Sequence, residues 1–495
     1  MFRFTVAPAC AVAVCGAVLV AVAPVLSASA DVANPHAEAA AAAAKWQAGE
    51  LVAGGIPGFA GSDWGLTIDT MMALAATRSE PTALGAAADA VAANVRRYNS
   101  AEEWGLPGSR IAGATAKVLF AAVVADRDPT RFGGLDMRAE TLDLIAGADA
   151  GEDAGRIRDK LTGSPDSGNT FGQSLAVLGL ARSGGVPQSA VDFLIAQQCP
   201  SGGFRLYPGR LGSTGATCQD TPTTVLDPDS TGMAVQALLS AAAESHSVGA
   251  ASAARKGADW LKSRQREDGS FGGSGPTAAS NSNSTGLAGQ ALHAAGYAVE
   301  SDRAAAWVLG HQITKDNAGA ADKEIGSIAY NAESLASARA DGIPEFQRDQ
   351  WRRATPQALL ALADVPLGDL GKAPPRPTGT TGTSSTATAT TSATTTHTAS
   401  AGASATSSAT RSATNSPSPT TSAGRTTSAS ATTTATPPAS VSGGNTGTGS
   451  GSAFGGHRLA RTGGRIGGAI LLAVGLVGTG IAVRAGARRR NGEHT

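Results

Sequence analysis

Residues 256–271 read K-G-A-D-W-L-K-S-R-Q-R-E-D-G-S-F. Residues 193–204, F-L-I-A-Q-Q-C-P-S-G-G-F, follow the same pattern of an aromatic residue and Leu before Gln, Gly and Phe. Its first half returns at 307–312 as W-V-L-G-H-Q. A unit that recurs along a chain indicates a repeat architecture, because each copy buries its apolar face against its neighbours.

A second kind of segment alternates with these repeats. It opens on Thr or Ser, at positions 70, 115, 170, 231, 285 and 327, and continues with small apolar residues. Such segments are apolar nearly all round and predict buried helices, whereas those ending in Gln carry a charged face and predict outer helices. Six buried helices alternating with six amphipathic ones predict an all-α fold, an (α/α)6 toroid or double ring, over residues 31–370.

The pattern at 256–271 resembles the QW repeat of squalene and oxidosqualene cyclases, with Phe271 in place of Trp. That family and the protein prenyltransferases share an α/α toroid, as does the helical domain of the cobalamin carriers, whose inner helices open Asp-Thr as Asp69-Thr70 does here. The chain also resembles actinobacterial surface proteins known only as prenyltransferase/squalene-oxidase repeat proteins. Within the repeat we expect structural roles: Gln265 bonds backbone groups, Gly269 takes a turn with positive φ, and Phe271 fills the hairpin.

Both ends of the chain predict a secreted protein. Residues 1–30 combine Arg3, an apolar run and Ala28-Ser29-Ala30, which is typical of a cleaved signal peptide. Residues 371–456 are rich in Ser, Thr, Ala and Gly and lack the apolar residues that folding requires, so we expect a disordered stalk.

The last segment, 457–495, holds L-A-R-T-G at 459–463, a predicted transmembrane helix at 466–483 and a basic tail at 484–495. This order resembles the cell-wall sorting signal of Gram-positive surface proteins, in the variant read by actinobacterial sortases. The resemblance implies that sortase cleaves after Thr462 and links it to peptidoglycan on the outside of the cell. The motif residues are Leu459, Ala460, Arg461, Thr462 and Gly463.

The chain has 39 Lys and Arg against 39 Asp and Glu, so its balanced charge gives no reason to expect nucleic acid as a partner. Once the signal peptide is removed, Cys199 and Cys218 remain, and outside the cell they are expected to form a disulfide. A zinc site is the rival interpretation, but neither cysteine belongs to a C-x-x-C pair. We therefore expect no metal and no required cofactor.

Residues 227–230, D-P-D-S, have two interpretations. They align with the Asp-x-Asp-Asp motif of class II terpene cyclases, and that resemblance implies Asp229 as a proton donor beside Asp227, with Ser230 replacing the last Asp. The interpretation that we favour is a helix cap, because Asp69, Asn169, Ser230 and Ser284 each stand just before the helical Thr in four of the six copies, and these are preferred N-cap residues. A carboxylate at a helix N-terminus is favoured in its ionised form.

A ring would bring all six inner N-termini to one end, which we expect to be the binding face. The candidate ligand-binding residues are Asp69, Arg205, Tyr207, Arg210, Asp227 and Asp229. The preferred function is a non-catalytic, wall-anchored module that binds a small molecule, a glycan or a partner protein.

Two alternatives stay open. One is a carrier of a corrinoid-like ligand, by resemblance to the cobalamin carriers. The other is an enzyme, either a diverged terpene cyclase or a glycan-cleaving enzyme. A glycosidase needs two carboxylates roughly 5 to 9.5 Å apart across a cavity, and Asp63, Asp69, Asp227 and Glu324 are the candidates.

Overall fold

The computed structural model describes residues 34–163, 166–209 and 217–372. The predicted signal peptide, stalk and sorting signal, including the span at 466–483, lie outside these residues, as does Arg210. None of the described helices has the length and apolar character needed to cross a bilayer.

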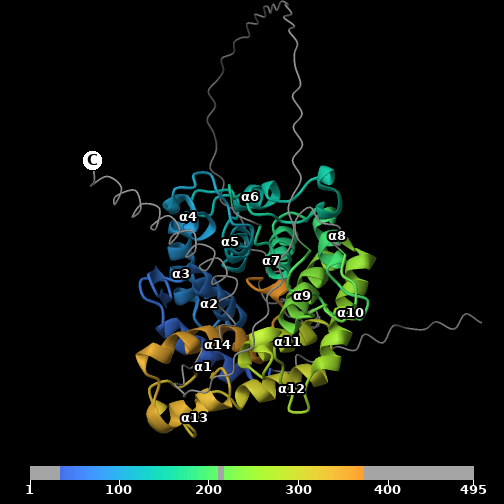
Figure 1. The fold of residues 1–495 in the computed structure, drawn as a ribbon. Coiled ribbons are helices and arrows are strands. Elements are labelled where there is room, and N and C mark those ends of the chain that lie inside the picture. Colours follow the sequence, from blue (N-terminus) through green and yellow to red (C-terminus); the bar gives the residue numbers. More distant parts are fainter. Residues whose placement is uncertain (1–33, 164–165, 210–216, 373–495) are drawn as a thin grey trace, which may run out of the picture. The chain divides into compact units, whose positions relative to one another are not determined.

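The described chain is almost entirely helical, and its helices form two concentric rings (Figure 1). The inner helices are α2 (Trp64–Thr77), α5 (Ala112–Val124), α7 (Thr170–Ala181), α9 (Pro228–Ser245), α11 (Ser282–Ala294) and α14 (Glu345–Ala363). The outer helices are α1 (Ala37–Gly49), α3 (Pro81–Ala93), α6 (Met137–Asp143), α8 (Gln188–Ala196), α10 (Val248–Arg264) and α12 (Ala298–Leu309). Each inner helix packs on the next, and α14 returns to α2, so the ring closes. The predicted all-α double ring is confirmed for this part of the chain.

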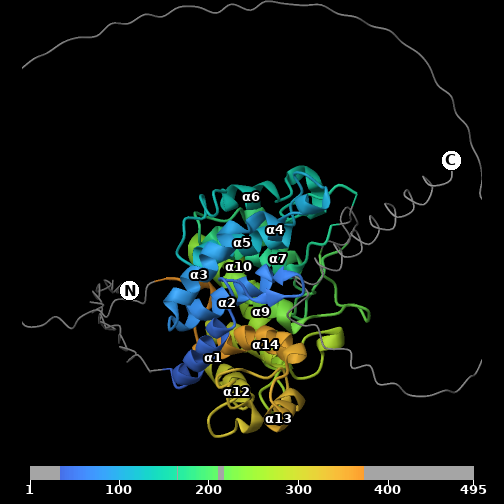
Figure 2. The ribbon, with the colours of Figure 1, turned by 90° about the vertical axis from the view of Figure 1, so that its left-hand side faces the viewer.

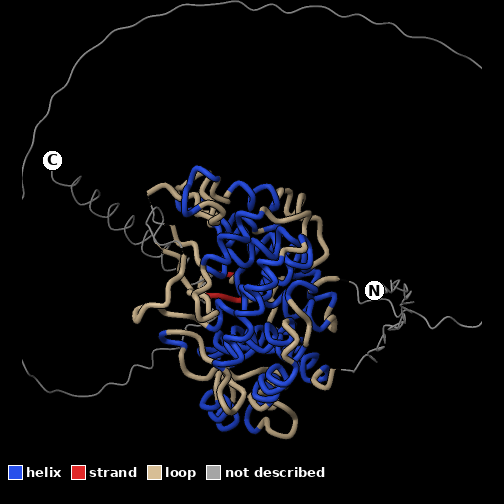
Figure 3. The backbone as a smooth tube through the Cα atoms, turned by 90° about the vertical axis from the view of Figure 1, so that its right-hand side faces the viewer, coloured by secondary structure: helices blue, strands red, loops and turns tan. Residues whose placement is uncertain are grey.

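Short elements fill the connections. They are α4 (Val95–Asn99), α13 (Ala332–Asp341), the 3₁₀ turns η1 (Glu102–Trp104), η2 (Ala148–Asp153), η3 (Gly275–Thr277), η4 (Gly319–Ala321) and η5 (Leu367–Asp369), and the antiparallel strands β1 (Pro57–Gly58) and β2 (Gly61–Ser62). In the side view α3 lies beside α2, and α1 lies beside α2 and α14 (Figure 2). The strand pair lies among the loops that lead into the inner helices (Figure 3). We call the end of the ring where the inner helices begin the mouth, and the opposite end the floor.

A buried threonine hydroxyl ties the incoming loop to its inner helix in four of the six repeats. The bonds run from Ile56 N to Thr67, from Phe204 N to Thr231, from Phe271 N to Thr285 and from Ile328 N to Thr355, each 2.9 to 3.0 Å long at Oγ1. In α7 the side chain of Gln173 takes this place and accepts from Ile157 N at 2.9 Å. The loop backbone therefore enters the apolar ring without an unsatisfied N–H group.

The glutamine of the repeat has the structural role expected of it. Gln265 Nε2 donates to Gly269 O at 3.0 Å and to Glu300 O at 2.8 Å, so it joins its own hairpin to the start of the next outer helix. Gln198 makes the equivalent pair of bonds. Gly269 has a φ of 89°, and Phe271 is buried.

The sixth inner helix is not where the repeat spacing placed it. The segment around 327 is a loop followed by α13, and the ring is completed by α14, with Thr355 at the equivalent position. The sequence signal of α14 is weak because its first half is charged and Pro356 lies inside it. Pro356 removes the N–H group that would bond to Arg352 O, and Gln47 Nε2 donates to that oxygen instead, at 3.2 Å.

The segment 364–372 closes the floor of the ring. Gln236 Oε1 accepts from Leu367 N at 2.7 Å, Gln290 Nε2 donates to Val365 O at 2.6 Å, and Arg182 Nη1 donates to Leu370 O at 3.0 Å. Arg78, at the end of α2, holds the carbonyl of Lys372 at 2.8 Å. The described chain therefore ends at the floor, opposite the mouth.

We predict that Thr285→Val, which keeps the side-chain shape, lowers the free energy of unfolding by about 1–3 kcal/mol, because Phe271 N loses its buried acceptor. Urea unfolding of the full chain measures this loss. Thr285→Ser keeps the hydroxyl and should lose much less. Equal losses for the two variants would contradict a role for the hydrogen bond.

Candidate functional site

The centre of the ring holds a small cavity. It is lined by Asp69, Met72, Lys117, Phe171, Leu175, Met233, Leu287, Pro356, Gln357, Leu360 and Leu367. The centre of a water molecule can move within about 20 Å³ of it, which is room for about one water. Most of the ring centre is therefore filled by side chains.

A buried ion pair forms the polar side of this cavity. Lys117 Nζ lies 2.6 Å from Asp69 Oδ1, and their side chains are 2% and 8% exposed. Burial raises the pKa of Asp69 above its usual value, and the ammonium group of Lys117 opposes part of that rise. Asp69 was predicted to be an N-cap, but it lies within α2, and Asp63 caps that helix by accepting from Leu66 N.

The aspartates at the start of α9 have separate roles. Asp227 is the N-cap: its Oδ2 accepts from Ser230 N at 2.9 Å and from Ser230 Oγ at 2.6 Å. The predicted cap at Ser230 is thus wrong by three residues. Asp227 also has counterparts in Asp63, Asn169 and Asn281, which cap α2, α7 and α11 in the same way.

Asp229 lies in the first turn of α9 and is 9% exposed. Burial, and then the nearby Asp227 carboxylate, raise its pKa to about 8, although the Ser284 hydroxyl beside it acts in the opposite direction. Neither Asp229 Oδ1 nor Ser284 Oγ has a hydrogen-bond partner of normal geometry among the described residues. Instead of the ionised group expected near a helix N-terminus, Asp229 is mostly protonated at pH 7.

The loop before α11 covers Asp229. A Cβ atom at Gly273 would lie only 2.8 Å from Asp229 Oδ2, so the backbone passes directly over the carboxyl group at a position where only glycine fits. Gly273 N donates to Thr277 O at 2.9 Å, which closes the loop on itself. This loop therefore forms the cover of Asp229.

Asp69 and Asp229 belong to opposite sides of the ring, since α9 is the third inner helix from α2 in either direction. Asp69 comes two residues after Thr67, the threonine that bonds the incoming loop in α2. Asp229 comes two residues before Thr231, the equivalent threonine in α9. Asp229 is also one turn before Met233, which lines the cavity. Asp229 is not among the residues that line the cavity, because its carboxyl group lies beside Ser284 and beneath Gly273, about 6 Å nearer the mouth than Asp69.

The other carboxylates considered from the sequence do not converge with them. Asp63 Oδ2 is paired with Arg353 at 2.7 Å, and Asp227 is the N-cap of α9. Glu324 lies away from the ring centre, where it accepts from Trp46 Nε1 at 2.7 Å and pairs with Arg348. Among the described residues, no group of three or more His, Cys, Asp or Glu side chains is arranged to hold a metal ion.

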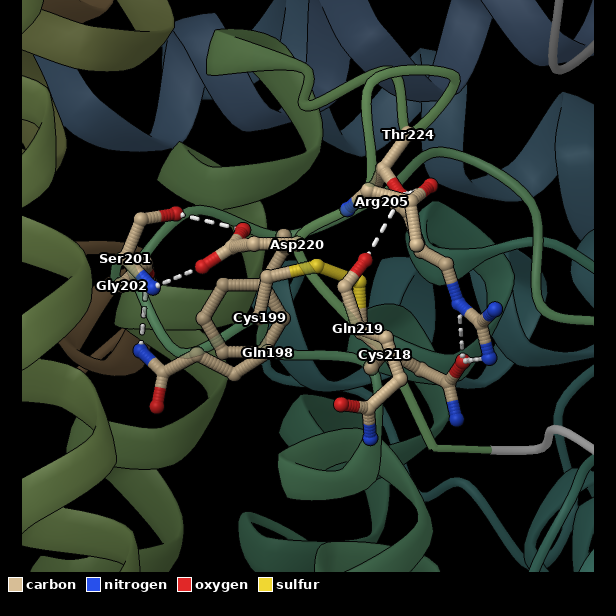
Figure 4. The surroundings of a disulfide bond; sticks show 12 residues. Gln198, Cys199, Ser201, Gly202, Arg205, Cys218, Gln219, Asp220 and Thr224 are labelled. Carbon is tan, nitrogen blue, oxygen red and sulfur yellow. Dashed lines mark hydrogen bonds between the residues drawn. A yellow bond between two sulfur atoms is a disulfide. The ribbon is translucent and has the colours of Figure 1, made fainter.

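The disulfide between Cys199 and Cys218 is present, with a Cα–Cα distance of 4.7 Å, and it fixes one loop of the mouth (Figure 4). Asp220 accepts from Ser201 N and Oγ beside it, and Arg205 donates to Gln197 Oε1 at 2.8 and 3.0 Å. Tyr207 is 51% exposed at the rim. The structure thus places Asp69, Asp227 and Asp229 in the ring and Arg205 and Tyr207 at its mouth.

No protein-family model and no curated protein matches the chain. Similar solved structures include a protein from Actinoplanes (16% identity, 66% of this chain and 99% of that one, TM-score 0.44). They also include the unsaturated glucuronyl hydrolase of Bacillus sp. GL1 (11% identity, 68% of this chain and 97% of that one, TM-score 0.45). A third is the type II terpene cyclase MstE from Scytonema (15% identity, 66% of this chain and 97% of that one, TM-score 0.43). Similarity at this level assigns no activity to the chain.

We predict that Lys117→Met lowers the free energy of unfolding by about 3–5 kcal/mol at pH 7, because it leaves Asp69 buried without its partner. The loss should shrink towards pH 4, where Asp69 can be protonated in both states. Combining Lys117→Met with Asp69→Leu removes both charges and should restore much of the stability. Urea unfolding compares the three proteins, and a double variant no more stable than the single one would contradict the role of the pair.

The pKa of Asp229 predicts a pH dependence of stability. Between the usual value of 3.8 and about 8, folding binds a proton at Asp229, so this group makes the wild-type protein less stable as the pH rises. Asp229→Asn removes that dependence. The variant should gain stability relative to the wild type from pH 4 to pH 8 in urea unfolding, and parallel profiles would contradict the raised pKa.

Proposed function

We propose that the described domain is the head of a wall-anchored surface protein and that it hydrolyses a glycan at the mouth of the ring. The observation that carries this proposal is a pair of buried carboxyl groups on opposite inner helices: Asp229, whose pKa is raised to about 8, and Asp69, which is paired with Lys117. Two acids whose environments separate their pKa values are typical of a general acid and a general base.

In this proposal Asp229 donates its proton to the glycosidic oxygen as the bond from the anomeric carbon to that oxygen breaks. Asp69 accepts a proton from a water molecule in the central cavity, and the water oxygen bonds to the anomeric carbon. Attack from the face opposite the leaving group inverts the configuration, as in glycosidases with two separated carboxyl groups. Lys117 is a positioning residue that holds Asp69 ionised.

The size of the cavity argues against the other enzymatic and carrier alternatives. Binding pockets for ligands of drug size or larger measure roughly 300–1,000 Å³, whereas the ring centre offers about 20 Å³. An isoprenoid chain or a corrinoid would have to displace the core side chains. A sugar at the end of a polymer needs only to reach the level of Asp229.

The floor segment supports display on a stalk. The described chain ends at Lys372, beside the C-terminal end of α2, so the proposed stalk begins at the end of the ring opposite the mouth. Anchoring through Thr462, with sortase and peptidoglycan as partners, is part of this proposal and rests on the sequence of 459–495.

Glycan binding without cleavage is the second candidate. It is favoured by the backbone of Gly273, which covers Asp229 and limits its access to a substrate. In that case the mouth holds a glycan, and Asp229 contributes only to the packing of the loop.

We predict that the full chain releases reducing ends from a polysaccharide and that Asp229→Asn lowers kcat by about 10²–10⁴-fold, the usual contribution of a general acid. The rate should also fall above about pH 8, as Asp229 loses its proton. A reducing-end assay measures both. Release by the wild type that is unchanged in Asp229→Asn would remove Asp229 from the mechanism, and no release from any substrate would leave binding as the function.

A further inference from the structure

We infer that the mouth of the ring carries an aromatic rim, formed by Phe59, Trp104, Tyr207 and Phe346, that binds an extended, uncharged polysaccharide strand. The inference rests on the proposed function for the location of the site, and it adds the class of polymer and the residues that hold it. Only Tyr207 was a candidate from the sequence.

The four aromatic residues share one end of the ring. Phe59 is fully exposed, Phe346 is 75%, Tyr207 51% and Trp104 36% exposed, and they are the exposed large aromatic side chains of the described chain. Phe59 precedes α2, Trp104 precedes α5, Tyr207 precedes α9, and Phe346 is in the first turn of α14. Each of these segments leads into an inner helix, so all four side chains lie at the mouth. The exposed apolar residues Val248 and Val299 begin outer helices and lie at the floor.

Two of them stand on neighbouring elements that are fixed to each other. Asp63, next to the β1–β2 hairpin that carries Phe59, pairs with Arg353 of α14 at 2.7 Å. Phe346 is seven residues before Arg353, two helical turns, and so lies on the same side of α14. Thr355 is the loop-bonding threonine of α14. Phe346 lies about 13 Å closer to the mouth than Thr355 along the helix axis. Tyr207 adjoins α7, since Thr170 N donates to Leu206 O at 2.9 Å.

The charges of the rim argue for an uncharged ligand. Those beside Phe59 and Trp104 form ion pairs within the protein: Asp63 with Arg353, Glu102 with Arg110 and Glu103 with Arg97, at 2.6 to 3.1 Å. Arg205, near Tyr207, donates two hydrogen bonds to Gln197 Oε1. Paired charges leave little field to attract a charged polymer. Phosphate-rich or uronic acid polymers would require unpaired cations at these positions.

The distribution of the aromatic rings favours a polysaccharide over a protein or a membrane. Protein interfaces and membrane-binding surfaces use contiguous apolar patches. Here single rings stand on separate segments: the β1–β2 hairpin, η1, the loop that contains Tyr207 and the first turn of α14. A flat ring packs against the C–H face of one sugar, so rings spaced around the mouth suit a strand several sugars long. Such a strand would pass over Asp229.

Affinity electrophoresis of the full chain tests the inference with soluble neutral polymers (mixed-linkage β-glucan, xylan, mannan and amylose) and charged ones (hyaluronate and polygalacturonate). At least one neutral polymer should retard the wild type, and Phe59→Ala with Tyr207→Ala should weaken that retardation about tenfold or more. The matched control, Val248→Ala with Val299→Ala, changes exposed apolar residues at the floor and should bind as the wild type does. Equal melting temperatures show that the variants are folded.

The inference is overturned if no neutral polymer binds, if only charged polymers bind, or if the rim variant binds as tightly as the control. Asp229→Asn separates it from the proposed function. Retained binding with lost cleavage supports both ideas, and binding without cleavage in the wild type supports the rim alone. Cleavage of a polymer with the same kcat/KM in the rim variant and the wild type overturns the rim alone.

Discussion

The ring depends on how a loop backbone can enter an apolar core. In five of the six repeats the incoming loop buries an N–H group that an inner-helix side chain accepts, and an unpaired buried N–H costs about 1–3 kcal/mol. The acceptor is the hydroxyl of Thr67, Thr231, Thr285 or Thr355, and in α7 it is the side chain of Gln173. Because the bond fixes each helix relative to its loop, it also fixes which residues face the ring axis.

This register determines the chemistry of the centre. The residue two positions after the loop-bonding threonine lines the cavity in four inner helices. These residues are Asp69, Met233, Leu287 and Gln357. In α9 the residue two positions before that threonine is Asp229, which packs beneath Gly273 of the next loop. The backbone of the loop at Gly273, and not a pocket, shields the carboxyl group of Asp229 from water. The last Asp of the cyclase motif is replaced by Ser230, but Asp229 still keeps its proton. Burial and then the negative charge of Asp227 raise its pKa.

The double ring could be predicted from the sequence, but only part of the candidate site could. The Gln, Gly and Phe spacing at 256–271 predicted paired helices because the bonds that Gln265 makes recur at Gln198 in another copy. The cap of α9 was misplaced although Pro228 is typical of the first helical position, which makes Asp227 the cap. Neither the pairing of Asp69 with Lys117 nor the cover over Asp229 is visible in the sequence, since each joins segments more than 40 residues apart.

The two ends of the ring differ because the chain itself closes one of them. The segment 364–372 places Leu367 and Leu370 in the core, and its backbone is held by α2, α7, α9 and α11. The described chain therefore shuts the cavity from the floor. The inner helices begin at the mouth, and the exposed aromatic rings lie at that same end. Under the proposed function, the chemistry of Asp229 is confined to the mouth of the ring.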